Sequence, residues 1–548
     1  MVTPEALSGV PKDVAVLVIG AGPVGLSLAI ELRLHGVEVL VIERDLEIAD
    51  SHPKGRANDL RTLEHYHRWG VSTELRRLAW KTRNPDQKVV ITNSIVERPL
   101  GAYPLQFGRH VEESKDYAAE PSFSVPQAIT TRVLQKRALE LGARVFRGWQ
   151  ALSIHQDAEK ATTELKSPTG SVHSVKSKYV VGCDGPDSLV RSTTGIGRTG
   201  EGPISRTVSY VVRSEGYKIG DMISSPAHDS LAFLMVLNPE VFTVISIPDD
   251  EQWGFSLQVA DDAPEPTDDE FQRVGQAVLG VKVPLTVVSS SSYRVFSRVA
   301  KSYRSGRLFL AGDAAHLCPP TGGHNMNVGI GDSINLAWKI AGLLQGWGGE
   351  KLLESYDIER RAVGNIVTSQ ALNHSRELAE VGEVFRTLPP LHPEAGPEER
   401  FRTGEIAYKA TYSQWNSLGT VLGQRYEDSP LTVRDDWVAP PYDASEYWHH
   451  ASPGHRAPHL WVEGKPLLDH FGKVFTLLDI EASEEQVGLL LEAAGRVGLH
   501  LTHFKLSAAL ARSKYPAEIT VIRPDQYISW QGSQCSDPAL IIDRIRGV

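Results

Sequence analysis

Three glycines and one carboxylate have the types and spacing that bind a dinucleotide. Gly20, Gly22 and Gly25 follow one apolar run, and Glu43 follows the next. In such a motif the first glycine permits a tight turn, the second lets the backbone approach a pyrophosphate, and the third allows close helix–strand packing. The phosphates would lie at a helix N-terminus, where free N–H groups favour negative charge. Because Glu43 can accept hydrogen bonds from a ribose, these residues predict a dinucleotide site.

A strand, a helix and a second strand must surround the glycines for them to work in this way. The apolar runs 14–19 and 37–42 are typical of buried strands, and a helix fits between them. The uncharged run 14–30 is short for a membrane span, which needs about 20 apolar residues, and glycine and proline interrupt it. The first dozen residues contain no apolar signal-peptide core. We therefore expect a soluble, cytoplasmic protein without a membrane span.

A second sequence of the same form, residues 195–200, lacks this context. No strand leads directly into it, and Glu201-Gly202-Pro203 follows where a helix should begin. We therefore interpret it as a loop and not as a second dinucleotide site. Any second nucleotide would have to bind without a Rossmann domain of its own.

Composition narrows the class of protein. The chain has 548 residues, enough for about three or four domains, and its net charge is −10. Nucleic-acid binding needs a clustered basic surface, so we expect no nucleic-acid partner. Cys183, Cys318 and Cys535 lie far apart and form no C-x-x-C pair, so neither a disulfide framework nor a metal site is predicted.

Periodicity along the chain indicates three further regions. Residues 206–259 contain several strand-like segments, which suggest a sheet domain inserted into the nucleotide domain, and Thr267 begins a capping box before a helix. Residues 307–310 form a strand that ends in Gly312-Asp313, and a turn at 319–323 leads into a long helix. From residue 467 onward, alternating strands and helices indicate a small separate α/β unit.

Three motifs stand in order along the chain. They are Gly20-Ala21-Gly22-Pro23-Val24-Gly25, then Cys183-Asp184-Gly185-Pro186-Asp187, and then Gly312-Asp313-Ala314-Ala315-His316 with Pro319-Pro320-Thr321-Gly322-Gly323. This set resembles the single-component FAD-dependent aromatic hydroxylases of the 4-hydroxybenzoate and phenol hydroxylase type. Residues 452–459 and 522–525 resemble the members with a thioredoxin-like C-terminal domain.

The resemblance implies an α/β fold, in which a Rossmann-like FAD-binding domain carries an inserted β-sheet substrate domain and a C-terminal thioredoxin-like domain. The expected division is 13–200 with 296–385 for FAD binding, 201–295 with parts of 80–125 for the sheet domain, 386–440 for a connector, and 441–548 for the thioredoxin-like domain. Without C-x-x-C the last domain can have no dithiol chemistry. We expect it to serve packing or oligomer contacts, as in a homodimer.

The resemblance also implies an extended FAD that contacts all three motifs. The ADP half would contact the first motif and Glu43, Asp313 would contact the ribityl chain, and Asp184-Gly185 would serve both FAD and NAD(P)H. The full set of expected cofactor-binding residues is Gly20, Gly22, Pro23, Gly25, Glu43, Arg44, Arg56, Gln127, Asp184, Gly185, Gly312, Asp313, Pro320, Gly323, Asn325, Met326 and Asn327.

The segment before the long helix could stabilise a reduced flavin. Hydride from NAD(P)H leaves negative charge on the flavin ring, and the helix N-terminus at 322–327 would stabilise that charge. The family would then use O2 to form a flavin C4a-hydroperoxide that hydroxylates a phenolic or polycyclic, polyketide-like aromatic substrate. The candidate catalytic residues are His324, Asn325 and Pro320. His324 and the nearby His316 would alternatively be structural.

Two residues depart from similar sequences, which usually have Gly at position 325 and Thr at position 328. Here they are Asn325 and Val328. Asn tolerates a left-handed backbone, so we expect the turn to persist, whereas a hydroxyl near the flavin or substrate is lost. This keeps open a flavin-dependent dehydrogenase or oxidase that inserts no oxygen. A flavin-binding protein without turnover is a further alternative.

Overall fold

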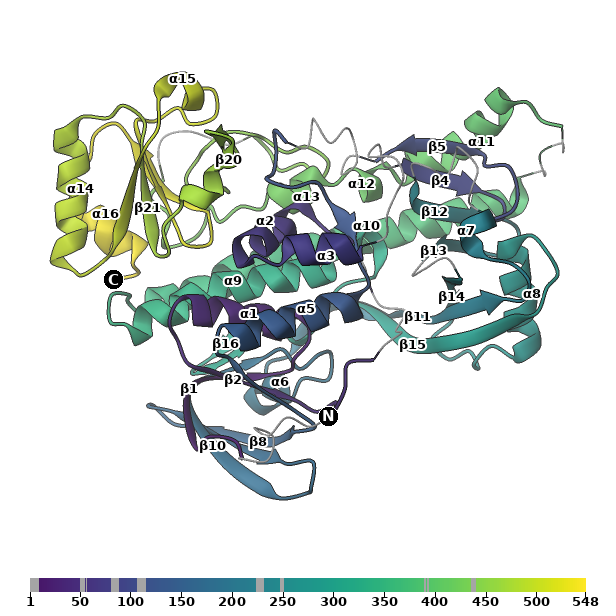
Figure 1. Cartoon of the computed structure of the whole chain (residues 1–548), viewed down its shortest axis with the longest axis horizontal. Helices are drawn as coiled ribbons and strands as arrows, with labels where there is room; N and C mark the ends of the chain where they lie inside the picture. The colour runs from purple at the N-terminus through teal and green to yellow at the C-terminus, as the bar shows by residue number, and fades with distance from the viewer. Residues whose placement is uncertain are drawn as a thin grey trace.

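The computed structural model describes residues 9–49, 55, 57–79, 88–105, 115–222, 231–246, 251–388, 391, 394–434 and 440–548. Arg56, an expected cofactor-binding residue, lies outside these ranges. Figure 1 shows a mainly parallel sheet at one side of the long helices α9 (Asn325–Leu344) and α10 (Lys351–Thr387), two further sheets at one end of them, and a small C-terminal unit at the other. None of the described helices combines the length and apolar composition needed to span a bilayer.

The glycine motif lies at one edge of a mainly parallel sheet. The main strand order is β16 (Arg304–Ser305), β17 (Leu308–Leu310), β10 (Val172–Gly182), β1 (Asp13–Ile19), β2 (Val39–Glu43) and β7 (Arg144–Arg147), and β8 (Gln150–Gln156) and β9 (Ala161–Lys166) extend it from β10. Strands β17, β10, β1 and β2 are parallel neighbours. Their carboxyl ends therefore meet at one edge, where ligands of open α/β sheets bind.

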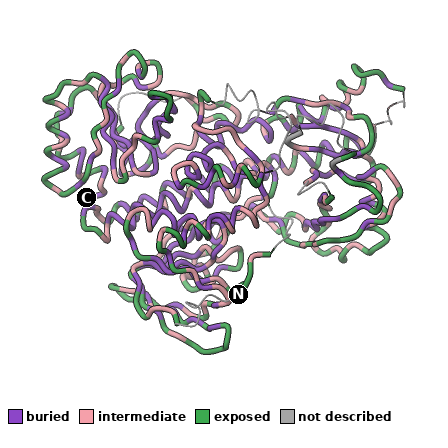
Figure 2. Tube along the Cα trace, viewed as in Figure 1, coloured by how far each residue is buried: buried purple, intermediate pink, exposed green. Residues whose placement is uncertain are grey.

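Helices cover this sheet because its strands are apolar on both faces. Residues 39–42 of β2 are all buried, as parallel strands between helical layers usually are. Helix α1 (Pro23–Leu34) packs against α5 (Gln127–Glu140) and against α9, which is buried along most of its length (Figure 2). This packing holds the N-terminal ends of α1 and α9 near the same sheet edge.

Two four-stranded sheets form the second region, one antiparallel and the other with a parallel pair of central strands. One has the order β14 (Gln252–Val259), β11 (Arg198–Ser214), β15 (Leu285–Ala300) and β18 (His316–Leu317). The other has the order β13 (Phe242–Ile245), β12 (Leu231–Leu237), β4 (Lys88–Thr92) and β5 (Gly101–Pro104), so segment 88–104 joins strands that follow it by more than a hundred residues. The predicted capping box at Thr267 is confirmed at the start of α8 (Asp268–Leu279).

The prediction of a loop at residues 195–200 is wrong in part. Gly195 ends α6 (Leu189–Thr194) in the left-handed conformation, but residues 198–200 already belong to β11 and pair with β15. Pairing with a long neighbouring strand orders residues that have weak strand preference of their own. No helix follows, so the segment does not form a second dinucleotide turn.

The stretch expected as a connector contains three helices. They are α11 (Pro397–Ala410), α12 (Tyr412–Trp415) and α13 (Leu418–Leu422). Helix α11 packs on β5, α12 contacts the segment 321–323, and α13 contacts α2 (Leu60–Trp69). The stretch therefore covers the ends of the sheet domain and lies near the predicted flavin segment.

The C-terminal unit is a four-stranded sheet with the order β22 (Leu501–Lys505), β21 (Phe475–Asp479), β23 (Ile519–Ile522) and β24 (Ile528–Gly532), accompanied by α14 (Glu484–Arg496) and α16 (Pro538–Ile545). Strands β21 and β22 are parallel and the other pairs antiparallel, which is the thioredoxin-like arrangement. Buried ion pairs attach it to the rest: Arg523 binds Glu359 of α10 at 2.7 and 2.8 Å, and Arg456 binds Glu64 of α2.

Candidate functional site

Steric surroundings explain why glycine stands at each of the three positions of the first motif. A side-chain carbon on Gly20, whose φ is +107°, would lie 2.2 Å from the Cys183 carbonyl oxygen, and one on Gly25 would lie 1.9 Å from the Gly20 carbonyl oxygen. Both positions therefore require glycine for packing. A carbon on Gly22 would meet nothing within 4 Å. Gly22 is the N-cap of α1, lacks a side-chain cap and precedes Pro23, so its surroundings leave room for a phosphate group.

The Glu43 carboxylate is fixed at the end of β2 by backbone donors. The Ala21 N–H donates to Oε2 at 2.8 Å and the Asp45 N–H donates to Oε1 at 3.0 Å. Its remaining lone pairs can accept from a ribose hydroxyl. Arg44 points into solvent, with its Nε 3.9 Å from an Asp45 carboxylate oxygen. Glu43 thus contacts the glycine turn, whereas the Arg44 side chain beside it is exposed to solvent.

The Asp184-Gly185 turn lies directly against the first motif, because Cys183 packs on Gly20 and Gly25. Asp184 Oδ2 accepts from the N–H groups of Leu189 at 2.7 Å and Val190 at 3.2 Å. Burial raises the pKa of this carboxyl. Its other oxygen, Oδ1, is buried and has no partner among the described residues, and an orphaned polar atom here is suited to a ligand donor.

A chain of polar contacts lies behind Asp313. Asn325 Nδ2 donates to Asp313 Oδ1 at 2.8 Å, His316 Nδ1 lies 2.9 Å from Asn325 Oδ1, and His316 Nε2 lies 2.9 Å from Asp332 Oδ2. Asp332 also accepts from the Gly312 N–H at 3.0 Å and from Arg360 Nε at 2.8 Å. Sequence reasoning missed Asp332 and Arg360, since neither belongs to a motif.

Protonated His316 fits both of its contacts, because each ring nitrogen then donates. Burial alone would lower the pKa of His316, but Asp332 more than offsets this and raises it to about 10. Because the imidazolium donates to Asn325 Oδ1, the Asn325 amide group is directed toward Asp313. The Asp313 side chain itself is exposed at the sheet edge and can reach a ligand.

Two consecutive residues in the segment before α9 have left-handed backbone conformations. Gly322 has φ +79° and Gly323 has φ +67°, and only glycine adopts these angles without strain. The turn persists with Asn at position 325, although Asn325 itself is the first residue of α9 and is not left-handed. Asn327 fixes the segment through 3.1 Å and 2.9 Å donations to the carbonyls of Ala57 and Gly323.

The N-terminus of α9 is open for an anionic group. Its N-cap residue, His324, makes no side-chain capping hydrogen bond. The unsatisfied N–H groups and the helix dipole place positive potential there. Pro320 is exposed beside it and Met326 is half-buried, while Gln127 begins α5 and donates from its backbone to the Gly55 carbonyl at 3.2 Å.

His324 is buried, and burial lowers its pKa to about 3. A second histidine, His374 of α10, lies beside it with ring centroids 6.3 Å apart. Sequence reasoning missed His374, because it lies on another helix and belongs to no motif.

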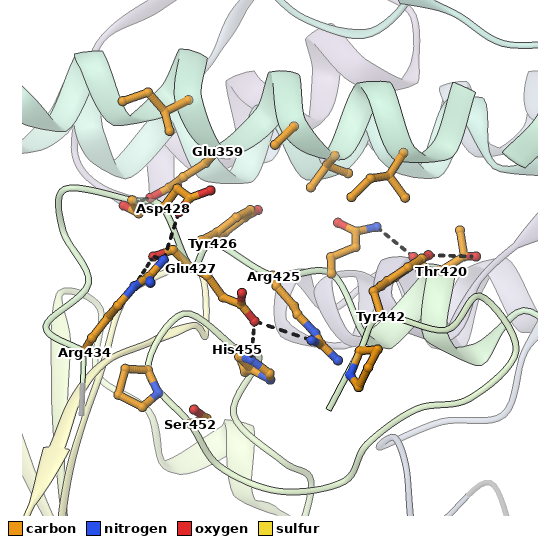
Figure 3. Close-up of a pocket in the computed structure, with 18 of the residues that line it drawn as sticks. Glu359, Thr420, Arg425, Tyr426, Glu427, Asp428, Arg434, Tyr442, Ser452 and His455 are labelled. Atoms are coloured by element: carbon orange, nitrogen blue, oxygen red, sulfur yellow. Dashed lines mark hydrogen bonds and ion pairs between the residues drawn. The ribbon is translucent and has the colours of Figure 1, made fainter. Parts of the chain in front are cut away.

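A cavity lies away from these residues. It has a volume of about 560 Å³ and is bounded by α10 and by residues between 420 and 455 (Figure 3). Arg425 and His455 each lie 3.4 Å from Glu427 Oε1 on its wall. No expected cofactor-binding or catalytic residue lines it.

Known proteins resemble this chain over nearly its whole length. Residues 13–371 match the family described as FAD binding domain, and residues 450–544 match the family described as aromatic-ring hydroxylase, C-terminal. The FAD-dependent monooxygenase apdD of Emericella nidulans is 30% identical and covers 97% of this chain and 90% of its own. Aklavinone 12-hydroxylase RdmE of Streptomyces purpurascens is 28% identical, with coverage of 96% and 97%.

The fold is shared with a solved hydroxylase. The ternary complex of aklavinone-11 hydroxylase with FAD and aklavinone superposes with a TM-score of 0.81 at 26% identity, covering 98% of this chain and 99% of that one. The predicted family and fold class are thereby confirmed. The open turn at Gly22 leaves room for the phosphates of FAD, the free oxygen of Asp184 can accept from a donor group of a ligand, and the glycine pair before α9 allows a flavin ring to approach the backbone. The chain belongs to the FAD-dependent aromatic-ring hydroxylases and is a flavin-dependent monooxygenase.

Proposed function

We propose that this monooxygenase hydroxylates a phenolic, polycyclic aromatic compound, with NAD(P)H as reductant. The reaction consumes NAD(P)H, a proton, O2 and an aromatic C–H, and yields NAD(P)⁺, water and an aromatic C–OH. The observation that carries the proposal is the open N-terminus of α9, preceded by the left-handed pair Gly322-Gly323. The hydroxylases similar to this chain that are named for aklavinone support a polycyclic substrate.

The chain's own residues would have distinct tasks. Gly20, Gly22, Pro23 and Gly25 would seat the pyrophosphate and Glu43 the adenosine ribose. Bound FAD supplies hydride acceptance and the activation of O2. The positive end of α9 would favour the negative charge of the reduced ring.

Asp313 would accept from the ribityl hydroxyls, and Asp184-Gly185 would contact both FAD and NAD(P)H. Arg44, Gln127, Gly312, Met326 and Asn327 complete the proposed contacts, together with Arg56, which lies outside the described residues. Pro320, Gly323, His324 and Asn325 would border the reacting ring and exclude water from it.

The first test is substrate-stimulated consumption of NAD(P)H by the FAD-loaded protein. A panel of phenols and hydroxylated polycyclic aromatics is added, and NAD(P)H oxidation is followed at constant oxygen. The proposal predicts that at least one polycyclic phenol accelerates oxidation and gains a hydroxyl group. If no compound accelerates it, the proposed substrate class is wrong.

One observation favours a second candidate, a dehydrogenase or oxidase that inserts no oxygen. Val328 is apolar and buried on the first turn of α9, where the family resemblance leads us to expect Thr. Such an enzyme would reduce O2 to hydrogen peroxide and release a product without oxygen from O2. Reaction under labelled oxygen separates the two candidates.

A further inference from the structure

The cavity shown in Figure 3 has an apolar wall formed by one face of α10. Ile358, Ala362 and Ile366 stand about one turn apart along this wall, and the buried Val363 and Val367 lie beside them. Ile358 is 38% exposed and Ile366 is 41% exposed, so two large apolar side chains border open space. The wall is about 12 Å long, because a helix rises 1.5 Å per residue. A flat apolar ligand along it would remove both isoleucines from water.

The side of the cavity opposite α10 carries a hydrogen-bond donor and an acceptor next to each other. Arg425 Nη1 lies 3.4 Å from Glu427 Oε1 and donates to the Pro440 carbonyl at 2.7 Å. Figure 3 shows Arg425, Glu427 and His455 turned toward one another. Among the described residues, neither Arg425 Nη2 nor Glu427 Oε2 has a hydrogen-bond partner. A ligand can therefore accept from the guanidinium and donate to the carboxylate at the same time.

The charges around the cavity are already balanced. The hydrogen bond from His455 and the charge of Arg425 lower the pKa of Glu427, so an ionised carboxylate lies beside a guanidinium. Arg434 on the rim pairs with a neighbouring carboxylate at 2.8 Å, and Glu359 is bound by two buried cations. An anionic ligand would be repelled by Glu427 and a cationic one by Arg425. An uncharged ligand is therefore favoured.

A carboxamide attached to an aromatic ring has the required properties. Its carbonyl oxygen accepts and its N–H group donates, side by side on one edge, and the group carries no charge. A ketone of the same shape only accepts, and a carboxylate only accepts and is negative. The ring supplies a flat apolar face for α10. The cavity volume of about 560 Å³ lies within the range of roughly 300–1,000 Å³ that is typical of small-molecule sites.

The cavity is separate from the proposed flavin site. None of the expected cofactor-binding residues lines it. Val363, Val367 and Tyr426 on its inner side belong to one buried cluster with Val328, which lies on the first turn of α9. Packed side chains thus stand between a ligand in the cavity and the segment before α9. Such a ligand would be bound by residues that have no part in the proposed oxygen transfer.

We propose that the cavity between α10 and residues 420–455 binds an uncharged, planar aromatic carboxamide. The ring lies along the apolar wall of α10, the amide oxygen accepts from Arg425, and the amide N–H donates to Glu427. The inference does not depend on the proposed hydroxylation and adds a second small-molecule site to the chain. A ligand held in this way would link α10 to the segment that leads into the C-terminal unit.

Three naphthalene derivatives of nearly the same shape test the ligand class. They are 2-naphthamide, which donates and accepts, 2-acetylnaphthalene, which only accepts, and 2-naphthoate, which is an anion. Binding to the oxidised FAD-loaded protein is measured by equilibrium dialysis without NAD(P)H, so turnover plays no part. We expect 2-naphthamide to bind about 5-fold more tightly than either of the others, because neither of them can donate to Glu427.

Two tryptophan variants establish whether the probe binds in the cavity. A362W adds an indole to the exposed Ala362 on the apolar wall and should weaken binding of 2-naphthamide by about 10-fold or more, because the indole fills the ligand's space. N365W is the matched control. Asn365 is exposed on the same helix but does not line the cavity, so this variant should bind the probe as the unmodified protein does.

Two variants of Glu427 test the acceptor. E427L should reduce the preference for 2-naphthamide over 2-acetylnaphthalene to about 2-fold or less, because leucine offers no polar atom. E427Q keeps an accepting oxygen and should retain most of the preference. Thermal unfolding and flavin absorbance establish that each variant is folded and loaded.

Each outcome either supports or overturns the inference. Equal binding of the three probes by the unmodified protein, or no binding of 2-naphthamide, overturns it. Unchanged binding in A362W, an equal loss in N365W, or a preference that survives in E427L also overturns it. Loss of binding in A362W, with a preference lost in E427L and kept in E427Q, supports it. Should A362W or E427L fail to fold, the ranking of the three probes by the unmodified protein still decides. No oxygen is transferred in these measurements, so their outcome is independent of the proposed function.

Discussion

Asn325 supplies a contact that the glycine usual at this position could not make. Its amide lies between His316 and Asp313, so the charge of a buried ion pair is linked to an exposed carboxylate at the sheet edge. The sequence suggested only that Asn would tolerate the turn. The role of its side chain depended on His316 and Asp332, which α9 and β18 bring together.

The change N325G should weaken FAD binding without abolishing it. Losing one hydrogen bond to the Asp313 carboxylate costs about 1.5 kcal/mol, so we expect a rise of roughly 10-fold in the FAD dissociation constant. Titration of the apoprotein by flavin fluorescence measures it. N238G, which removes an Asn side chain from the sheet domain, is the control and should leave FAD affinity unchanged. An unchanged affinity in N325G would show that Asp313 is positioned by other means.

The His316–Asp332 pair predicts a pH-dependent contribution to stability. The pKa of His316 rises from 6.5 to about 10 in the folded protein, because Asp332 outweighs the effect of burial. A raised pKa means that folding favours the protonated ring. Its contribution is therefore complete below the unfolded value of 6.5 and is lost as pH rises through about 10. The difference in unfolding free energy between the unmodified protein and H316Q should narrow over this range. A constant or widening difference would contradict the assignment.

At the scale of elements, two turns and two helices make the site. The N-termini of α1 and α9 lie at one sheet edge, since α1 packs on α9 along its length. The glycine turns allow the backbone at both termini to come close to a ligand. Gly322 combines a positive φ with the nearby His324 ring, so a side chain at this position would be both strained and too close to that ring.

The change G322A should destabilise the protein more than backbone strain alone would. Its methyl group would lie 2.6 Å from His324 Nε2, which is a steric clash, in addition to the strain of an alanine at φ +79°. Gly346 has the same φ of +79° with nothing within 4 Å of an added carbon. G346A therefore controls for strain and should lose about 1–2 kcal/mol of stability, whereas G322A should lose more. Denaturant unfolding measures both losses, and equal losses would contradict the predicted clash at Gly322.

Features that depend on residues close together in the sequence could be predicted, whereas features that depend on contacts between distant residues could not. The first βαβ unit, the Thr267 capping box and the strand before Gly312 follow from local pattern, and the structure agrees. Residues 198–200 were misread because pairing with β15 orders them. The helices within 386–440 were missed because proline and glycine punctuate that stretch. His374, Asp332 and Arg360 have no local signal, and only the packing of α10 against α9 brings them to the site.

At the scale of the whole molecule, buried charges hold the C-terminal unit in place. Arg456 Nε donates to Glu64 Oε2 at 3.0 Å, and both side chains are almost inaccessible. Burial would raise the pKa of Glu64, but Arg456 and Arg61 lower it below its ordinary value. These contacts join residues that are nearly four hundred positions apart, so the unit is part of one folded body.

The change R456M should destabilise the protein strongly, because it removes a partner from the buried Glu64 carboxylate. Loss of one partner of a buried pair typically costs about 3–5 kcal/mol. Denaturant unfolding, followed by tryptophan fluorescence, measures it. R434M is the matched control, since Arg434 pairs with Asp428 at 2.8 Å on the surface and should contribute less than about 1 kcal/mol. Equal effects of the two changes would show that the buried pair does not hold the unit.

We propose that this chain transfers oxygen from O2 to a polycyclic phenol. The most direct test is reaction of the FAD-loaded protein with NAD(P)H and the best substrate of the panel under ¹⁸O2, followed by mass spectrometry of the product. We expect one ¹⁸O atom in the new hydroxyl group when O2 carries the label, and none when water carries it. A product without ¹⁸O, formed together with hydrogen peroxide, would contradict it and identify the chain as an oxidase or dehydrogenase.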